Sequence, residues 1–164
     1  MKISILNIFK NNLFSIKEKI FRLAFFMSSF SVFILSVYAP FIQHLNGYPN
    51  GESVYSLLSN LCHQYPLRSF WIFDRPFALC ARCTSIYFGI SFGALFIAIN
   101  KKYLFRFFLG ILIILFIAID PVLQLFGFYE STNLIRTITG LIIGVGFFFI
   151  INPFNQITLK QKEI

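Results

Sequence analysis

Between Arg22 and Glu52 the chain has no charged residue, and the apolar run from about Leu23 to Ile42 is long enough to cross a lipid bilayer. About twenty helical residues cover the hydrocarbon core, because each adds about 1.5 Å along the helix axis. In the whole chain 57% of residues are hydrophobic and 12% are charged, whereas about a quarter are charged in soluble domains. The sequence therefore predicts an integral membrane protein.

Two further spans follow this first one, with polar residues at their ends. The second begins near Pro76, a residue favoured in the first turn of a helix, and runs to Ile99. In the third, only the uncharged residues 107–119 precede Asp120, which is fewer than the roughly twenty that a span requires. We therefore expect this helix to carry Asp120 to the membrane boundary, to kink at Pro121 and to continue beyond it.

The fourth span is short of uncharged residues in the same way. Residues 137–152 are too few alone, so its first turns should include Asn133 and Arg136, and Pro153 should close it.

These spans predict an all-α fold, an integral membrane bundle of four transmembrane helices. Residues 1–22 are expected to form a basic cytoplasmic lead-in, either a helix on the membrane surface or a loosely ordered segment. Residues 23–152 form the membrane domain, with an outer Cys/His loop at 46–79 that contains a short amphipathic helix at 52–61. Residues 153–164 are a cytoplasmic tail.

The basic residues predict the orientation of the bundle in the cell membrane. With both termini in the cytoplasm, ten of the fourteen basic residues lie on the cytoplasmic side, as the positive-inside rule requires. Because they are scattered at segment ends, the net charge of +8 indicates contact with the lipid bilayer and not with nucleic acid. The remaining four, on the outer side, are all arginines: Arg68, Arg75, Arg82 and Arg136.

Polar side chains on the third and fourth spans are predicted to meet near the outer face. Asp120 and Gln124 are four residues apart on one helix face, and Asn133 and Arg136 are three apart on another. Ionisable groups in a membrane are usually paired or functional, so Asp120 is expected to pair with Arg136. This polar pocket is a candidate catalytic site; the alternative is an ion pair that only fixes helix register.

Two pairs of glycines are spaced for close helix packing. Gly89 and Gly93 on the second span, and Gly140 and Gly144 on the fourth, each form a small-xxx-small face. Such faces let membrane helices approach one another closely.

All three cysteines of the chain, Cys62, Cys80 and Cys83, lie in one short stretch with His63. Three cysteines and one histidine are a common tetrahedral zinc set, and the start of a helix favours thiolate at Cys80 and Cys83. Either His63 or His44 is a candidate fourth ligand. A water molecule in that position, with histidine behind it, would leave the site open for catalysis.

Other readings of the cysteines stay open. Thr84 occupies the position where a c-type haem site has histidine, and the motifs of a zinc deaminase are absent. Redox-active thiols on the outer side, or purely structural ones, are alternatives to a metal. Zinc is the favoured cofactor, with iron or no metal as alternatives.

These motifs resemble a family of small polytopic membrane proteins from bacteria and archaea that is known only as a domain of unknown function. The likeness covers roughly residues 30–148, and Ser85 stands where the family tends to have glycine. It implies a shared site without an established activity. The motifs are Cys62-His63-Gln64, Arg68-Ser69-Phe70, Cys80-Ala81-Arg82-Cys83-Thr84 and Tyr87, then Asp120, Gln124, Ser131-Thr132-Asn133, Arg136 and Thr139-Gly140.

Three functions are compatible with these features. The first is a membrane metalloenzyme that acts on a lipid or lipid-linked substrate, the second a dithiol–disulfide oxidoreductase, and the third a non-enzymatic metal-binding or transport accessory protein. The polar pocket favours the first, because a simple metal clip would not require embedded charges. Further candidate site residues are Arg68, Arg82, Tyr87 and His44.

Overall fold

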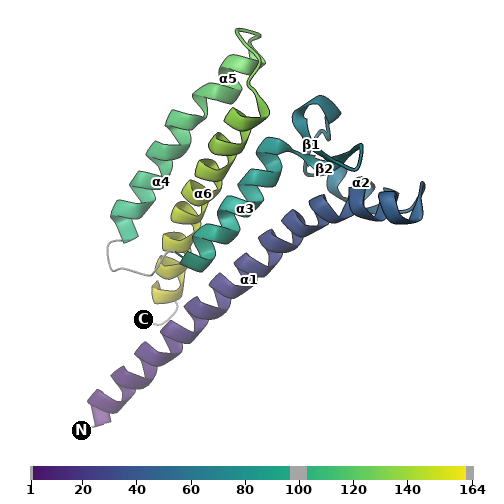
Figure 1. Cartoon of the computed structure of the whole chain (residues 1–164). Coiled ribbons are helices and arrows are strands. Elements are labelled where there is room, and N and C mark those ends of the chain that lie inside the picture. Colours follow the sequence, from purple (N-terminus) through teal and green to yellow (C-terminus); the bar gives the residue numbers. More distant parts are fainter. Residues whose placement is uncertain (1, 97–102, 162–164) are drawn as a thin grey trace.

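The computed structural model describes residues 2–96 and 103–161 and is mostly helical (Figure 1). The helices α1, α3, α4 and α6 run up and down in alternation, and both chain ends lie at the same end of the molecule (Figure 1). The elements are α1 (Lys2–Asn46), α2 (Glu52–Ser59), the 3-10 helix η1 (Pro66–Arg68), β1 (Ser69–Ile72), β2 (Arg75–Cys80), α3 (Ala81–Phe96), α4 (Tyr103–Ile117), α5 (Ile119–Leu125) and α6 (Asn133–Gln161).

Three helical segments are long and apolar enough to cross a membrane: Lys19–Asn46, Phe107–Leu125 and Asn133–Ile151. They coincide with the first, third and fourth predicted spans. The predicted second span corresponds to α3, of which the structure describes the 16 residues Ala81–Phe96.

The prediction of an all-α fold is wrong for the outer loop, which contains a small antiparallel sheet of β1 and β2. Phe73 and Asp74 form the turn, both with positive φ (51° and 57°), which matches the right-handed twist of a two-residue hairpin. Pro76 lies in β2, opposite Trp71, so it does not open the second helix. Proline is tolerated here because each strand of a two-stranded sheet has one unpaired edge.

Helices α1 and α6 extend beyond the predicted spans. The backbone of α1 is continuous from Lys2, so the basic segment prolongs the first span's helix; its position on the membrane surface stays a prediction. Helix α6 continues through Pro153 to Gln161. The prediction that Pro153 closes this helix is therefore wrong, since a proline removes only one backbone hydrogen bond and membrane helices often tolerate it.

The predicted kink of the third span lies between α4 and α5, at Ala118. Pro121 has no N–H to donate to the Ile117 carbonyl, whereas the bonds on either side, from Ala118 N to Ile114 O and from Val122 N to Ala118 O, are present at 2.8 and 3.1 Å. The missing bond coincides with the break between the two helices, and α5 forms the end of the span. Asp120 and Gln124 both lie on α5.

Glycines bring α3 and α6 into backbone contact, as their spacing predicts. A Cβ atom on Gly89 would lie 2.4 Å from the Leu141 carbonyl oxygen, and one on Gly144 would lie 2.3 Å from that of Ile86. Contacts this short leave no room for any larger residue, so the two helices are held close together. The start of α3 and the first turns of α6 consequently lie close together, with Gly140 against the Arg82 backbone.

The outer loop has a small core of its own, formed by Ala39 of α1, Leu58 of α2, and Cys62, Ala78 and Leu79. The amphipathic helix predicted at 52–61 is present as α2 and packs on α1 and β2 through Val54 and Leu58. Leu57 on the same helix and Leu61 just beyond its end are exposed. Val54 and Leu58 are four residues apart and therefore share one face of α2, which is the buried face. Leu57 lies on a neighbouring face that is exposed.

Candidate functional site

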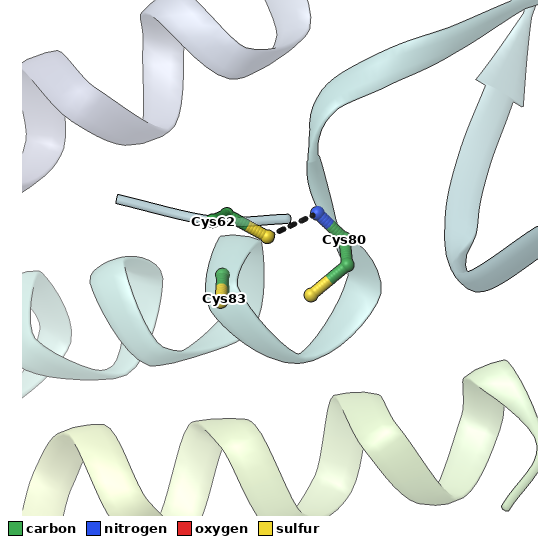
Figure 2. Close-up of side chains that lie close together, drawn as sticks. All are labelled: Cys62, Cys80 and Cys83. Atoms are coloured by element: carbon green, nitrogen blue, oxygen red, sulfur yellow. Dashed lines mark hydrogen bonds between the residues drawn. The ribbon is translucent and has the colours of Figure 1, made fainter. Parts of the chain in front are cut away.

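The three cysteines come together at the junction of the loop, the hairpin and α3. Cys62 follows α2, Cys80 ends β2, and Cys83 lies in the first turn of α3 (Figure 2). Their sulfur atoms all lie within 4.8 Å of one another. Zinc–sulfur bonds of about 2.3 Å at tetrahedral angles place sulfurs about 3.8 Å apart, so a small contraction would fit this donor set to a metal ion.

All three thiols are free, and Cys62 is the buried one of the three. The Sγ of Cys62 accepts a hydrogen bond from the backbone N of Cys80 at 3.4 Å (Figure 2). Hydrogen bonds from the Cys80 and Cys83 side chains lower the pKa of the Cys62 thiol far below its ordinary value. The pKa of Cys80 is raised, above all by its bond to Cys62. The cluster is thus suited to hold one thiolate, which is the form that binds metals and attacks disulfides.

Neither predicted histidine joins the cysteines, which form the cluster alone among the residues that the structure describes. His63 is exposed although it directly follows Cys62. His44 stacks on Phe73 at the hairpin turn, with ring centroids 4.2 Å apart. A metal held by the three thiols would keep one coordination position for another ligand.

Tyr87 lies one turn after Cys83 on α3 and packs with both Cys80 and Cys83 against the outer-loop core. Thr84, beside Cys83, hydrogen-bonds to Ser36 of α1 at 3.3 Å and to the Leu79 carbonyl, also at 3.3 Å. These contacts fix the start of α3 against α1 and the end of β2. The cysteine positions are therefore set by packing on several elements.

The expected ion pair between Asp120 and Arg136 is wrong, because Arg82 is the partner of Asp120. The Arg82 guanidinium donates to Asp120 Oδ2, and Tyr129 donates its hydroxyl to Oδ1. The side chains of Arg82 and Asp120 are only 18% and 12% exposed. Arg82 lies in the first turn of α3, between Cys80 at the end of β2 and Cys83, and its guanidinium reaches Asp120 on α5.

Arg136 binds neutral groups instead. Its Nη1 donates to Asn133 Oδ1 at 3.0 Å. Its Nη2 donates to the Gln124 amide oxygen at 2.8 Å, in the amide orientation that also lets this oxygen accept from Ser131 N. Arg136, Gln124 and Asn133 thus do form one cluster, as the sequence predicts, next to the Arg82–Asp120 pair that Ser131 contacts at 3.4 Å.

One residue joins this arginine network to the cysteine cluster. Asn133 Nδ2 donates to the carbonyl oxygen of Ser69 at 3.3 Å, and Ser69 is the strand partner of Cys80. The cysteine cluster and the polar pocket are therefore neighbours: the Asn133–Ser69 hydrogen bond and the Ser69–Cys80 strand pair connect them.

Sequence reasoning missed Tyr129, named Ser131 only as part of a family motif without a role, and gave Arg82 no partner. The signal for Arg82 was its position in the sequence: it lies close to the proposed ligands Cys80 and Cys83 and is one of the four arginines predicted on the outer side. Tyr129 and Ser131 lie in the short connection between α5 and α6, where no periodic pattern marks them.

The family model described as predicted membrane protein (DUF2085) matches residues 62–150, more than half of the 164-residue chain. The chain belongs to this family. The expected resemblance is thereby confirmed, and the chain is a membrane protein. The match begins at Cys62 and contains all three cysteines, Asp120 and Arg136.

Two archaeal relatives are similar to this member of the DUF2085 family. The uncharacterized protein MJ1492 of Methanocaldococcus jannaschii is 37% identical over 152 residues, which cover 82% of this chain and 94% of that protein. An uncharacterized protein of Methanothermobacter thermautotrophicus is 36% identical over 88 residues, which cover 52% of this chain and 79% of that protein. No solved structure matches the chain.

Proposed function

We propose that the protein is a membrane metalloenzyme that binds zinc through Cys62, Cys80 and Cys83 and acts on a lipid-type substrate. The observation that carries this proposal is the meeting of three free thiols within 4.8 Å of one another. A buried structural zinc usually has four protein ligands, whereas a catalytic zinc has three and one open position. Three thiols without a histidine fit the second pattern.

The adjacent network supplies the groups that such an enzyme requires. When bound, zinc would act as a Lewis acid toward a ligand at its open position. Arg136, Asn133 and Gln124 offer donors for the polar part of a substrate, and the Arg82–Asp120 pair holds α3 and α5 in register beside them. A site at the outer end of membrane helices suits a molecule whose apolar part stays in the bilayer.

The topology that we propose is four spans, with α3 as the second and both termini in the cytoplasm. The alternating course of the four long helices and the ten cytoplasmic basic residues support it. Reporter fusions at Gly51 and Lys160 are expected to report opposite compartments. A single compartment for both would refute four spans.

The proposed metal is tested by elemental analysis of purified protein together with a free-thiol count. We expect close to one zinc per chain and thiols that react only after chelation. Iron in place of zinc would keep the site and change the metal, and a metal-rich protein without activity on any lipid would fit an accessory protein.

One observation favours a second candidate, a dithiol oxidoreductase: Cys80 and Cys83 are free thiols beside Cys62, whose pKa is lowered. In that case one thiolate of a substrate dithiol would attack the Cys80–Cys83 disulfide and form a mixed disulfide, which frees one cysteine thiol. The second substrate thiol would then attack the mixed disulfide, so that the substrate leaves as a disulfide and Cys80 and Cys83 are left reduced by two electrons and two protons. Attack by Cys62 on a stalled mixed disulfide would instead return the substrate as a dithiol and leave a disulfide that includes Cys62. Metal-free protein with an intact bond between residues 80 and 83 would select this candidate.

A further inference from the structure

A cavity of about 410 Å³ lies at the start of α6, and Asn133, which lines it, hydrogen-bonds to Ser69, the strand partner of Cys80. It is lined by residues of η1, of the connection before α6 and of the first turn of α6, and we call it the anion cavity. The polar residues that line it are Arg68, Glu130, Ser131, Thr132, Asn133 and Arg136.

Arg136 gives this cavity an uncompensated charge. The residue is only 5% exposed, and within 2–96 and 103–161 no carboxylate forms an ion pair with it. Its Nε, like that of Arg82, has no hydrogen-bond partner among the described residues. A buried guanidinium that meets only neutral groups is costly, so an anion in the cavity would remove that cost.

Arg68 adds a second positive charge to the cavity lining. Its guanidinium lies over the Tyr65 ring, 5.6 Å from the centroid, and 3.9 Å from Glu130. The Glu130 side chain is 86% exposed, so it is largely solvated and does not neutralise Arg136. The cavity lining therefore keeps a net positive charge.

The start of α6 provides further donors. Thr132 caps the helix: its carbonyl accepts from Arg136 N at 3.0 Å and its Oγ1 accepts from Ile135 N at 3.4 Å. The first turn of a helix has free N–H groups and a partial positive charge, which favour phosphate. Two arginines and a helix start offer donors from separate elements, which suits the several oxygens of a phosphate better than a single charge would.

We propose that the anion cavity binds a phosphate group, that of a phospholipid or other lipid-linked phosphate at the membrane surface, or of a free phosphate compound. This inference rests on the proposed function, because the phosphate would be the anionic part of the lipid-type substrate proposed above. The cavity would hold the phosphate while the rest of the molecule extends along the helices.

The test is a binding measurement on the purified, metal-loaded full chain in detergent and in nanodiscs. One arm titrates inorganic phosphate; the other compares nanodiscs that contain phosphatidic acid with nanodiscs of phosphatidylcholine alone. Arg68→Gln is the test variant, because Arg68 is partly exposed and its loss should not prevent folding. Arg75→Gln removes an arginine of the adjoining hairpin that does not line the cavity, and is the matched control.

We expect Arg68→Gln to weaken binding about tenfold, the effect of one charged hydrogen bond, and Arg75→Gln to leave it unchanged. Arg136→Gln should weaken it further if the variant folds. Binding in both arms assigns the site to phosphate itself, and binding in the lipid arm alone assigns it to the lipid headgroup. No binding in either arm, or equal weakening by Arg68→Gln and Arg75→Gln, overturns the inference.

Metal content measured on the same samples separates the two proposals. If the protein bound phosphate but took up no metal, the proposed metalloenzyme would be overturned and the proposed anion cavity would stand. If the protein carried stoichiometric metal but bound no phosphate, the anion cavity would be overturned and the proposed metal site would stand.

Discussion

The cysteine cluster and the arginine network are neighbours at one end of the bundle, yet they are assembled in different ways. The cluster comes from one stretch, residues 62–83, folded back on itself by a two-residue turn. The network joins β1, α3, α5 and α6, and its partners are up to 64 residues apart in the chain. The first is a local arrangement that can be recognised from spacing; the second depends on how the helices are rotated against one another.

The largest effect is expected in the cluster itself. Cys62→Ser, Cys80→Ser and Cys83→Ser should each abolish metal binding, because each removes one of only three clustered ligands. His63→Ala and His44→Ala should keep the metal, since neither side chain joins the sulfurs. Elemental analysis of the five variants decides this. If His63→Ala lost the metal, the loop would have to rearrange on binding.

In the network, Arg82→Met should cost about 3–5 kcal/mol, because it leaves Asp120 buried without its partner. The double variant Arg82→Met/Asp120→Leu should recover much of this loss. Arg136→Met with Asp120→Leu is the matched pair, and its effects should simply add. Denaturant unfolding in detergent measures the free energies of the three single and two double variants, and coupling between Asp120 and Arg136 instead would contradict the structure.

The next largest effect is expected where α3 and α6 touch, because this contact places the cysteine cluster and the arginine network side by side. Gly144→Val would put its Cβ 2.3 Å from the Ile86 carbonyl oxygen, so α3 and α6 must separate, at a cost of about 1–3 kcal/mol. Ile142→Val, at a partly exposed position of the same helix, should change stability by less than about 0.5 kcal/mol. Thermal unfolding compares the two; equal stability would mean that α3 and α6 are not closely packed.

The smallest effect tests the link between the regions. Asn133→Ala removes the hydrogen bonds to Ser69 O and Arg136, worth about 1–2 kcal/mol together, and should leave the metal in place. Thr139→Ala, which loses only bonds within its own helix turn, is the control. Metal loss in Asn133→Ala alone would show that the network holds the hairpin in position for the cluster.

Several features followed directly from the amino-acid order. The uncharged runs gave three candidate spans, because a fixed rise per residue ties length to membrane thickness. Pro121 gave the kink, because it lacks a donor. The Gly89 and Gly144 faces gave the close contact of α3 and α6, and the short spacing of the cysteines gave their cluster.

Other features were decided only by the tertiary structure. The hairpin turn uses Phe73 and Asp74, which carry no strong turn signal, so a strand replaced the predicted helix start at Pro76. Arg82, and not Arg136, reaches Asp120, because long side chains on three helices can each satisfy a carboxylate and only the helix rotations choose among them. His63 adjoins Cys62 in sequence but stays outside the cluster, since the direction of a loop side chain depends on packing that no local pattern encodes.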